Sequence, residues 1–391
     1  MKYNFDKVID RSGTSAEKVE GLKHIWGRTD LIPLWVADMD FATAPFVTDA
    51  IRKRCENEVL GYTGKPDSYY NAIINWVKQR YDLIVTKEVI NFVPGIVPGI
   101  GMAMNCFTQK GDKVMIQPPV YHPFAWVTTR NERTLVINPL KWENGMYRMD
   151  LDAFREQIIG CKLFILCNPH NPGGVVWTEA ELRAIADICY DEKVLVFSDE
   201  IHADLTLPPH THRPFATVSE KARMNSVTFM SPSKAFNMPG LSASHALIFN
   251  EDLRKRFRIY MDAGELDMGH VFAFLSVEAA YSHGTEWLDQ CLAYIQGNID
   301  FVDEFLKKHA PKIKAIRPEA SYLVWLDCRE LELSQKDLNE FFVDKAHLAL
   351  NDGEMFGKEG IGFMRLNVAS PRCIIEKAMK QLADAYQLYI K

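Results

Sequence analysis

Short apolar runs alternate with longer stretches of helical periodicity from about residue 46 to residue 250. Apolar runs of this length predict buried strands, and they lie at 113–117, 134–138, 161–167, 193–198, 226–230 and 243–249. Helical segments separate most of them, and the one from Thr178 to Tyr190 begins with a capping box made by Thr178 and Glu181. The alternation predicts an α/β fold whose mostly parallel sheet is covered by helices on both faces.

The two ends of the chain lack this alternation of short apolar runs and helical stretches. Residues 1–45 are rich in loop-forming positions, and long amphipathic stretches run through 270–310. A strand-like piece at 322–326 and a helical tail at 371–391 follow. We therefore expect a large domain of residues 46–286 and a smaller α+β domain formed by residues 1–45 together with residues 287–391.

Composition narrows the class of protein. The 391 residues are 47% hydrophobic and 25% charged, as in an ordinary globular protein, and the net charge of −6 disfavours nucleic acid or an anionic membrane as a partner. No apolar run is long enough to cross a membrane, and the first residues lack the apolar core of a signal peptide. The eight cysteines include no C-x-x-C pair, which predicts reduced thiols in a cytoplasmic protein.

The most informative motif is Ser231-Pro232-Ser233-Lys234, which directly follows the predicted strand 226–230. A lysine at a strand end can form a Schiff base with an aldehyde cofactor, and serine hydroxyls can hold that cofactor's phosphate. A polar loop with a solvated lysine is the alternative. The motif alone leaves the two interpretations balanced.

Two further strand ends carry polar side chains. The segment 168–174, N-P-H-N-P-G-G, follows strand 161–167, and its asparagine amides can face a ligand. Asp199 and His202 follow strand 193–198. A helix cap is the ordinary role for such an acid, but a carboxylate here could also keep a pyridine nitrogen protonated. His202 alone carries little weight.

A glycine-rich run, Gly95 to Gly101, opens the predicted helical segment 100–108. Backbone N–H groups at a helix start suit a phosphate. The dinucleotide fingerprint fails because Met104 stands where the third glycine belongs, and Gly61 to Lys65 lacks the P-loop spacing. Enzymes that use a nicotinamide cofactor or ATP are therefore disfavoured.

Tyr121 and Arg365 complete the candidate site. Tyr121 follows strand 113–117, where its ring could stack on a flat cofactor or simply fill the core. Arg365 lies in an apolar stretch, and its anionic partner is either a substrate carboxylate or a structural carboxylate. His210 and His212 lie in a proline-rich loop without a third ligand, so no metal is expected.

Together these motifs resemble the fold-type I pyridoxal-phosphate enzymes, the aspartate aminotransferase or class I/II superfamily. The resemblance spans essentially the whole chain and is closest to the MalY/PatB branch of cystathionine β-lyase-like C–S lyases. The segments that carry it are Pro33 to Phe41 (PLWVADMDF), Tyr121 to Phe124 (YHPF), Ser198 to His202 (SDEIH) and Ser231 to Lys234 (SPSK).

The resemblance implies a role for each candidate residue around a bound pyridoxal 5'-phosphate. Lys234 would hold the aldehyde, Asp199 would pair with the ring nitrogen, and Tyr121 would stack on the ring. Asn171 and His202 would lie near the phenolic oxygen. The phosphate would be bound by Ser231, Ser233 and the backbone of Ile96 and Val97. Tyr62 would bind the phosphate of a neighbouring subunit, in a homodimer with shared sites. Arg365 and the backbone near Ala37 would bind the carboxylate of a small amino-acid substrate.

One position departs from the common aminotransferase pattern. Many members carry a phosphate-binding arginine two residues after Gly240, where this chain has Ser242. The loss of that cation favours the lyase branch, which implies β-elimination of cystathionine or a related cysteine S-conjugate to a thiol, pyruvate and ammonia. Transamination is the alternative, because the same residues would hold the cofactor for it. A regulatory protein that acts through protein contacts on the same fold is a further alternative.

Overall fold

A central seven-stranded sheet organises the computed structural model, which describes residues 2–389. The strand order is β2-β10-β9-β8-β7-β3-β4, and β10 is the strand that runs antiparallel to its neighbours. The strands are β2 (Ile90–Val93), β3 (Lys113–Ile116), β4 (Thr134–Ile137), β7 (Cys161–Cys167), β8 (Leu195–Asp199), β9 (Ser226–Met230) and β10 (Ser244–Leu247). The predicted α/β fold with a mostly parallel sheet is confirmed.

Helices cover both faces of this sheet because alternate strand residues point to opposite sides. In β8, Phe197 packs into a cluster with α4 (Ile96–Phe107), α5 (Pro123–Arg130) and α9 (Glu251–Ala263). Val196 faces the other side, toward α6 (Leu151–Gln157), α7 (Glu179–Asp191) and α8 (Glu220–Met224). The same side of β2 and β10 packs on α3 (Asp67–Tyr81) and α10 (Val271–His283).

Several predicted boundaries are corrected. Helix α4 begins at Ile96, four residues before the predicted start at residue 100, because Gly95, at φ 120°, turns the chain directly after β2. The predicted buried strand 134–138 is an edge strand with partly exposed residues, because β4 pairs with β3 alone. The helix at Thr178 has the predicted capping box.

Some elements were not predicted. Strand β2, helix α2 (Pro45–Cys55) and the hairpin of β5 (Lys141–Glu143) with β6 (Met146–Arg148) are among them. The N-terminal segment, expected to be loop-rich, contains α1 (Glu17–Trp26).

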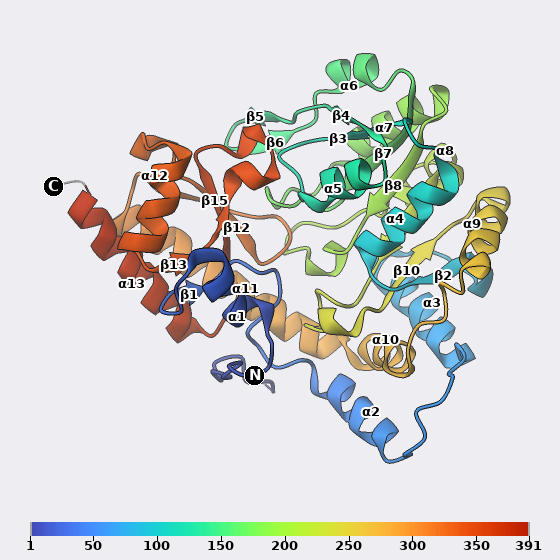
Figure 1. Ribbon diagram of the computed structural model, residues 1–391, viewed down its shortest axis with the longest axis horizontal. Helices are drawn as coiled ribbons and strands as arrows, with labels where there is room; N and C mark the ends of the chain where they lie inside the picture. Colours follow the sequence, from blue (N-terminus) through green and yellow to red (C-terminus); the bar gives the residue numbers. More distant parts are fainter. Residues whose placement is uncertain (1, 390–391) are drawn as a thin grey trace.

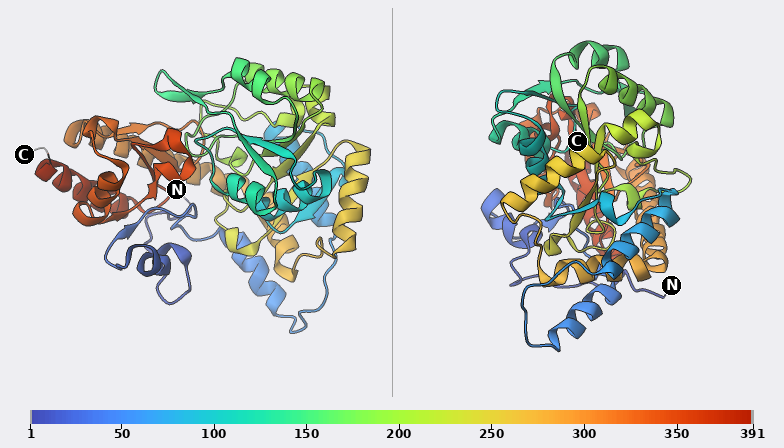
Figure 2. Two further views of the ribbon diagram at one scale, coloured as in Figure 1. Left: turned by 45° about the horizontal axis from the view of Figure 1, so that its top comes forward. Right: turned by 90° about the vertical axis from the view of Figure 1, so that its right-hand side faces the viewer.

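A second, four-stranded antiparallel sheet lies in the C-terminal part of the chain, drawn in orange to red at the left of Figure 1 and of the left view in Figure 2. Its strands, in order, are β11 (Lys314–Ile316), β12 (Leu323–Asp327), β15 (Phe363–Asn367) and β14 (Asn351–Asp352). The helices of this part are α11 (Thr285–His309), α12 (Gln335–Glu340) and α13 (Arg372–Tyr389). Residues 390 and 391 of the predicted tail helix lie outside the described residues.

The N-terminal segment joins this C-terminal part. Strand β1 (Ile32–Pro33) pairs in parallel with β13 (Leu348–Ala349), and Figure 2 shows the dark blue segment beside the orange elements. The division into residues 46–286 and residues 1–45 with 287–391 stays a prediction. Within residues 2–389, no helix combines the length and apolar character needed to cross a membrane.

Candidate active site

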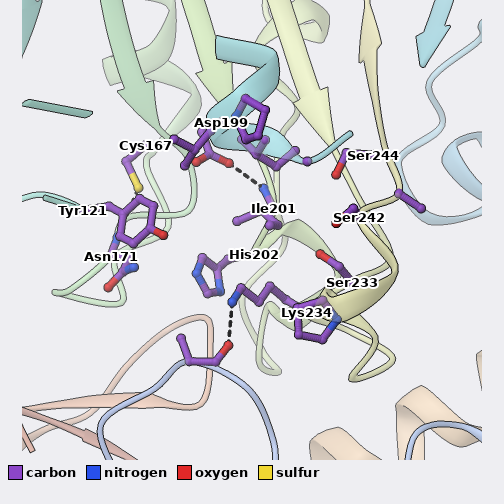
Figure 3. Close-up of a pocket in the computed structure, with 17 residues that line it drawn as sticks. Tyr121, Cys167, Asn171, Asp199, Ile201, His202, Ser233, Lys234, Ser242 and Ser244 are labelled. Atoms are coloured by element: carbon purple, nitrogen blue, oxygen red, sulfur yellow. Dashed lines mark hydrogen bonds between the residues drawn. The ribbon is translucent and has the colours of Figure 1, made fainter. Parts of the chain in front are cut away.

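A cavity of about 200 Å³ opens at the carboxyl edge of the central sheet, where parallel-sheet proteins bind their ligands. Figure 3 shows side chains from several strand ends converging on it. The lining residues are Ala37, Gly95, Ile96, Val97, Pro98, Tyr121, Cys167, Asn171, Asp199, Ile201, His202, Ser233, Lys234, Pro239, Ser242, Ala243 and Ser244. Most of the predicted site residues are therefore brought together in one place.

Lys234 reaches into the cavity from the loop after β9. Its Nζ donates a hydrogen bond to the carbonyl of Ala37 at 2.5 Å, drawn as a dashed line in Figure 3. Burial lowers the pKa of this amine to about 8, and Arg365 acts in the same direction, while Asp38 and Asp199 oppose it. A lysine whose pKa lies this close to neutral pH can act as a nucleophile and as a base.

Asp199 ends strand β8 and is buried beside the cavity. Its Oδ1 accepts a hydrogen bond from the N–H of Ile201 at 3.1 Å. Burial raises the pKa of this carboxyl to about 7, and neighbouring Glu200 adds to the shift. A cationic group at this end of the cavity would restore the ionised form, so the site is suited to a protonated ring nitrogen.

Polar and aromatic groups surround the space between Lys234 and Asp199. His202 is buried and its Nδ1 has no hydrogen-bond partner in the protein, and burial lowers the pKa of its ring to about 3. Asn171 and Tyr121 lie together on another side of the cavity (Figure 3). An uncharged imidazole, an amide and a phenol ring match the polar edge and the flat face of an aromatic cofactor.

The start of helix α4 and three serines form an anion-binding corner. Ile96 and Val97 occupy the first turn of α4, whose N–H groups have no helical partners. Ser233, Ser242 and Ser244 line the same cavity, and Figure 3 places their side chains near one another. Helix-start amides and hydroxyls can together hold a phosphate without an arginine.

The antiparallel direction of β10 explains why Ser244 belongs to this corner. In an all-parallel sheet the start of that strand would lie at the far edge. Because β10 runs in the opposite direction, Ser244 lies opposite Val93, the last residue of β2, and thus at the cavity. The sequence could not identify Ser244, since the pattern of the run does not reveal its direction.

Two predicted cofactor-binding residues lie outside the lining of this cavity. The hydroxyl of Ser231 is buried 2.8 Å from the carbonyl of Ala243 and 2.9 Å from the hydroxyl of Ser233, so in this structure it supports Ser233. Tyr62 is 97% exposed in the loop between α2 and α3 and lines a different depression. Its predicted role requires a second subunit and stays a prediction.

Arg365 on β15 is buried next to the cavity, and the partners of its guanidinium are neutral oxygens. It donates to Oδ1 of Asn171 at 3.1 Å, to Oδ1 of Asn351 at 2.6 Å and to the carbonyl of Trp35 at 3.2 Å. Its Nε has no partner in the protein. Burial lowers the pKa of the guanidinium to about 10. A cation held in this way is suited to an anionic ligand.

Other residues at the site escaped sequence reasoning. Tyr322 donates to the same Ala37 carbonyl as Lys234, at 2.9 Å, and Cys167 at the end of β7 lines the cavity. Tyr322 begins a predicted strand and Cys167 ends one. Both therefore resembled core residues, and only the arrangement in space shows that they border the site.

Comparison with known proteins identifies the family to which this chain belongs. The model of the aminotransferase class I and II family matches residues 29–382. The chain belongs to this family. Cystathionine beta-lyase PatB from Bacillus subtilis (strain 168) is 38% identical over 384 residues, which are 98% of this chain and 99% of that protein.

Solved structures agree with the family assignment. The PLP-bound C–S lyase from Staphylococcus hominis has a TM-score of 0.91 and 35% identity, and the match covers 99% of this chain and 98% of that one. A PLP-bound chain from Clostridium difficile 630, described provisionally as an aminotransferase, has a TM-score of 0.96 and 40% identity over 98% of this chain and 100% of that one. The class I and II fold of this chain is therefore found in both lyase-named and aminotransferase-named relatives.

Proposed function

We propose that this protein is a pyridoxal-phosphate-dependent C–S lyase that converts cystathionine or a related cysteine S-conjugate, with water, into a thiol, pyruvate and ammonia. The observation that carries the proposal is the convergence of the Lys234 amine, the Asp199 carboxyl and the Arg365 cation at one cavity. The high identity to PatB over nearly the full chain favours the lyase reaction.

The cavity fits the cofactor at three points. Lys234 would bind its aldehyde, the start of α4 with Ser233 would hold its phosphate, and Asp199 would face its ring nitrogen. The unpartnered Nδ1 of His202 and the raised pKa of Asp199 are costs that a bound polar ring would relieve. When bound, pyridoxal phosphate supplies the electron sink for the charge that develops at the substrate Cα.

The protein's own residues would supply orientation and proton transfer. Arg365 would hold the substrate carboxylate, because its present partners are all neutral. Once the substrate amine has displaced it from the cofactor aldehyde, Lys234 would take the proton from Cα, since a pKa of about 8 leaves part of the amine uncharged at neutral pH. The Cβ–S bond would then break with the sulfur leaving as thiolate, and hydrolysis of the released enamine would give pyruvate and ammonia.

We also infer a homodimer in the cytoplasm, in which the exposed Tyr62 of each subunit reaches the other's phosphate site. The exposure of Tyr62 and the eight cysteines without a disulfide support this inference. Cross-linking of a Tyr62→Cys variant to a cysteine introduced at Ser242 would test it. A cross-linked dimer supports shared sites, and a protein that stays monomeric at micromolar concentration contradicts them.

Product analysis separates the lyase from the aminotransferase. The holoenzyme is incubated with L-cystathionine without any added keto acid, and free thiol and pyruvate are measured over many turnovers. Equal, continuing release of both supports the lyase. Consumption of one L-cystathionine per active site without release of thiol, resumed only when a keto acid is supplied, would show transamination, the activity suggested by the provisional name of the Clostridium difficile chain.

A further inference from the structure

Two acidic residues beside the cavity have no part in the proposed chemistry. Asp38 and Asp40 belong to the N-terminal turn Trp35 to Phe41. The carbonyl of Ala37, directly before Asp38, accepts the hydrogen bond from Lys234. The charge of Asp38 therefore lies one residue from the acceptor of the reactive amine.

Two cations from the preceding segment face these carboxylates. Nζ of Lys18, on helix α1, lies 2.9 Å from Oδ2 of Asp40 and 3.6 Å from Oδ1 of Asp38, and it donates to the carbonyl of Asp38 at 3.2 Å. Arg11 contacts Asp38 at 2.5 Å and Asp40 at 3.1 Å. The side chain of Lys18 is 0% exposed, and lysine is almost never buried this fully unless it is paired.

The turn also accepts hydrogen bonds from residues on the substrate side of the site. Nδ2 of Asn367 donates to the carbonyls of Val36 and Asp38, both at 2.7 Å. Arg365 donates to the carbonyl of Trp35. A shift of this turn would therefore move the acceptor of Lys234 and a partner of Arg365 together.

We propose that Arg11 and Lys18 are positioning residues of the active site: by pairing with Asp38 and Asp40 they fix the turn against Lys234 and cancel the charge of Asp38 beside the amine. Their effect on turnover rests on the proposed function. Their effect on the amine does not, because it exists in the protein without cofactor or substrate.

The direction of the effect follows from the groups that face Lys234. Asp38 of the N-terminal segment and Asp199 of β8 raise the pKa of the amine, whereas Arg365 of β15 lowers it. His202 and Tyr322 also face it, and both are uncharged at neutral pH because burial lowers the pKa of the histidine and raises that of the tyrosine.

Loss of the Lys18 charge leaves Asp38 less compensated, which favours the protonated amine.

The experiment measures the titration of Lys234 in cofactor-free protein. Lys234 is labelled with an amine-selective acylating reagent at a series of pH values, and the extent is read by peptide mass spectrometry. We expect Lys18→Met to raise the midpoint above that of the wild type, and Lys18→Arg to keep the wild-type midpoint. Lys23→Met, which removes an exposed lysine of the same helix, is the matched control and should change nothing.

Arg11→Met provides an independent variant, since the Arg11 side chain is 23% exposed and tolerates replacement better than Lys18. It should raise the midpoint in the same direction, even where Lys18→Met fails to fold. Unchanged midpoints in the folded variants, with only a lower melting temperature, would overturn the proposal and leave the cluster a purely structural one. Absence of lyase activity in the wild type would affect the proposed function and not this result.

Discussion

Replacement of Arg365 by methionine should weaken catalysis strongly while leaving the fold intact. The guanidinium has only neutral hydrogen-bond partners, and burial lowers its pKa to about 10 from the usual 12.5. Since one pKa unit corresponds to about 1.4 kcal/mol, the free protein carries a penalty of about 3 kcal/mol for this cation. A substrate carboxylate would convert that penalty into binding energy.

The expected magnitude follows from what such pairs contribute. Removing one partner of a buried charged pair costs about 2–5 kcal/mol, so kcat/KM should fall about 150-fold for a loss of about 3 kcal/mol. Arg365→Lys keeps the charge and loses the two-pronged geometry, so its KM should rise about tenfold. Relief of the buried charge offsets the amide oxygens that lose a donor, so the melting temperature should stay near that of the wild type.

Steady-state kinetics and thermal unfolding of the same samples test this reasoning. Arg329 provides a control, because it pairs conventionally with Asp327 at 2.7 Å and is 46% exposed. Arg329→Met should leave KM unchanged. Arg365 does not bind the substrate carboxylate if both of its variants retain the wild-type KM, and it is a structural residue if they melt far below the control.

Two further predictions concern the cofactor pocket. Because burial raises the pKa of Asp199 to about 7, this carboxyl should contribute a loss of up to about 4 kcal/mol of stability in the cofactor-free protein as pH rises from about 4 to 7, since the folded state holds a proton that the unfolded state has released. Buried His202 acts in the opposite direction, because burial lowers its pKa to about 3. The difference in unfolding free energy between the wild type and Asp199→Asn, from urea unfolding at several pH values, should therefore fall by up to about 4 kcal/mol across this range, and a constant difference would contradict this. Ser242→Arg should tighten pyridoxal-phosphate binding about tenfold by adding a cation at the phosphate corner, and a dissociation constant equal to or weaker than that of the wild type would show that the phosphate lies elsewhere.

Most of the site residues named from the sequence lie around one cavity, whereas several of the elements that surround the cavity were not predicted. Lys234, Asp199 and Asn171 each follow a strand whose apolar run was visible, and carboxyl ends of parallel strands share one edge. Ser244 was missed because strand direction leaves no mark on an apolar run. The environment of Arg365 could not be predicted either, since its partners Asn171, Asn351 and Trp35 come from three distant parts of the chain.

The structure of the N-terminal segment could not be predicted from the sequence either. Helix α1 was not predicted, although it carries Lys18, whose burial depends on the carboxylates of Asp38 and Asp40. A lysine in a polar stretch of sequence gives no sign that it will be buried. Its surroundings follow from long-range packing of α1 on Trp35, whose indole N–H donates to the carbonyl of Lys18 at 3.0 Å.

The proposed function depends on attachment of the cofactor to the amine of Lys234. The most direct measurement is borohydride reduction of the protein loaded with pyridoxal phosphate, followed by peptide mass spectrometry. We expect a reduced phosphopyridoxyl group on the peptide that contains Lys234, and none after prior substitution of Lys234 by alanine. Labelling of another lysine in place of Lys234, or no labelling of the wild-type protein, would contradict it.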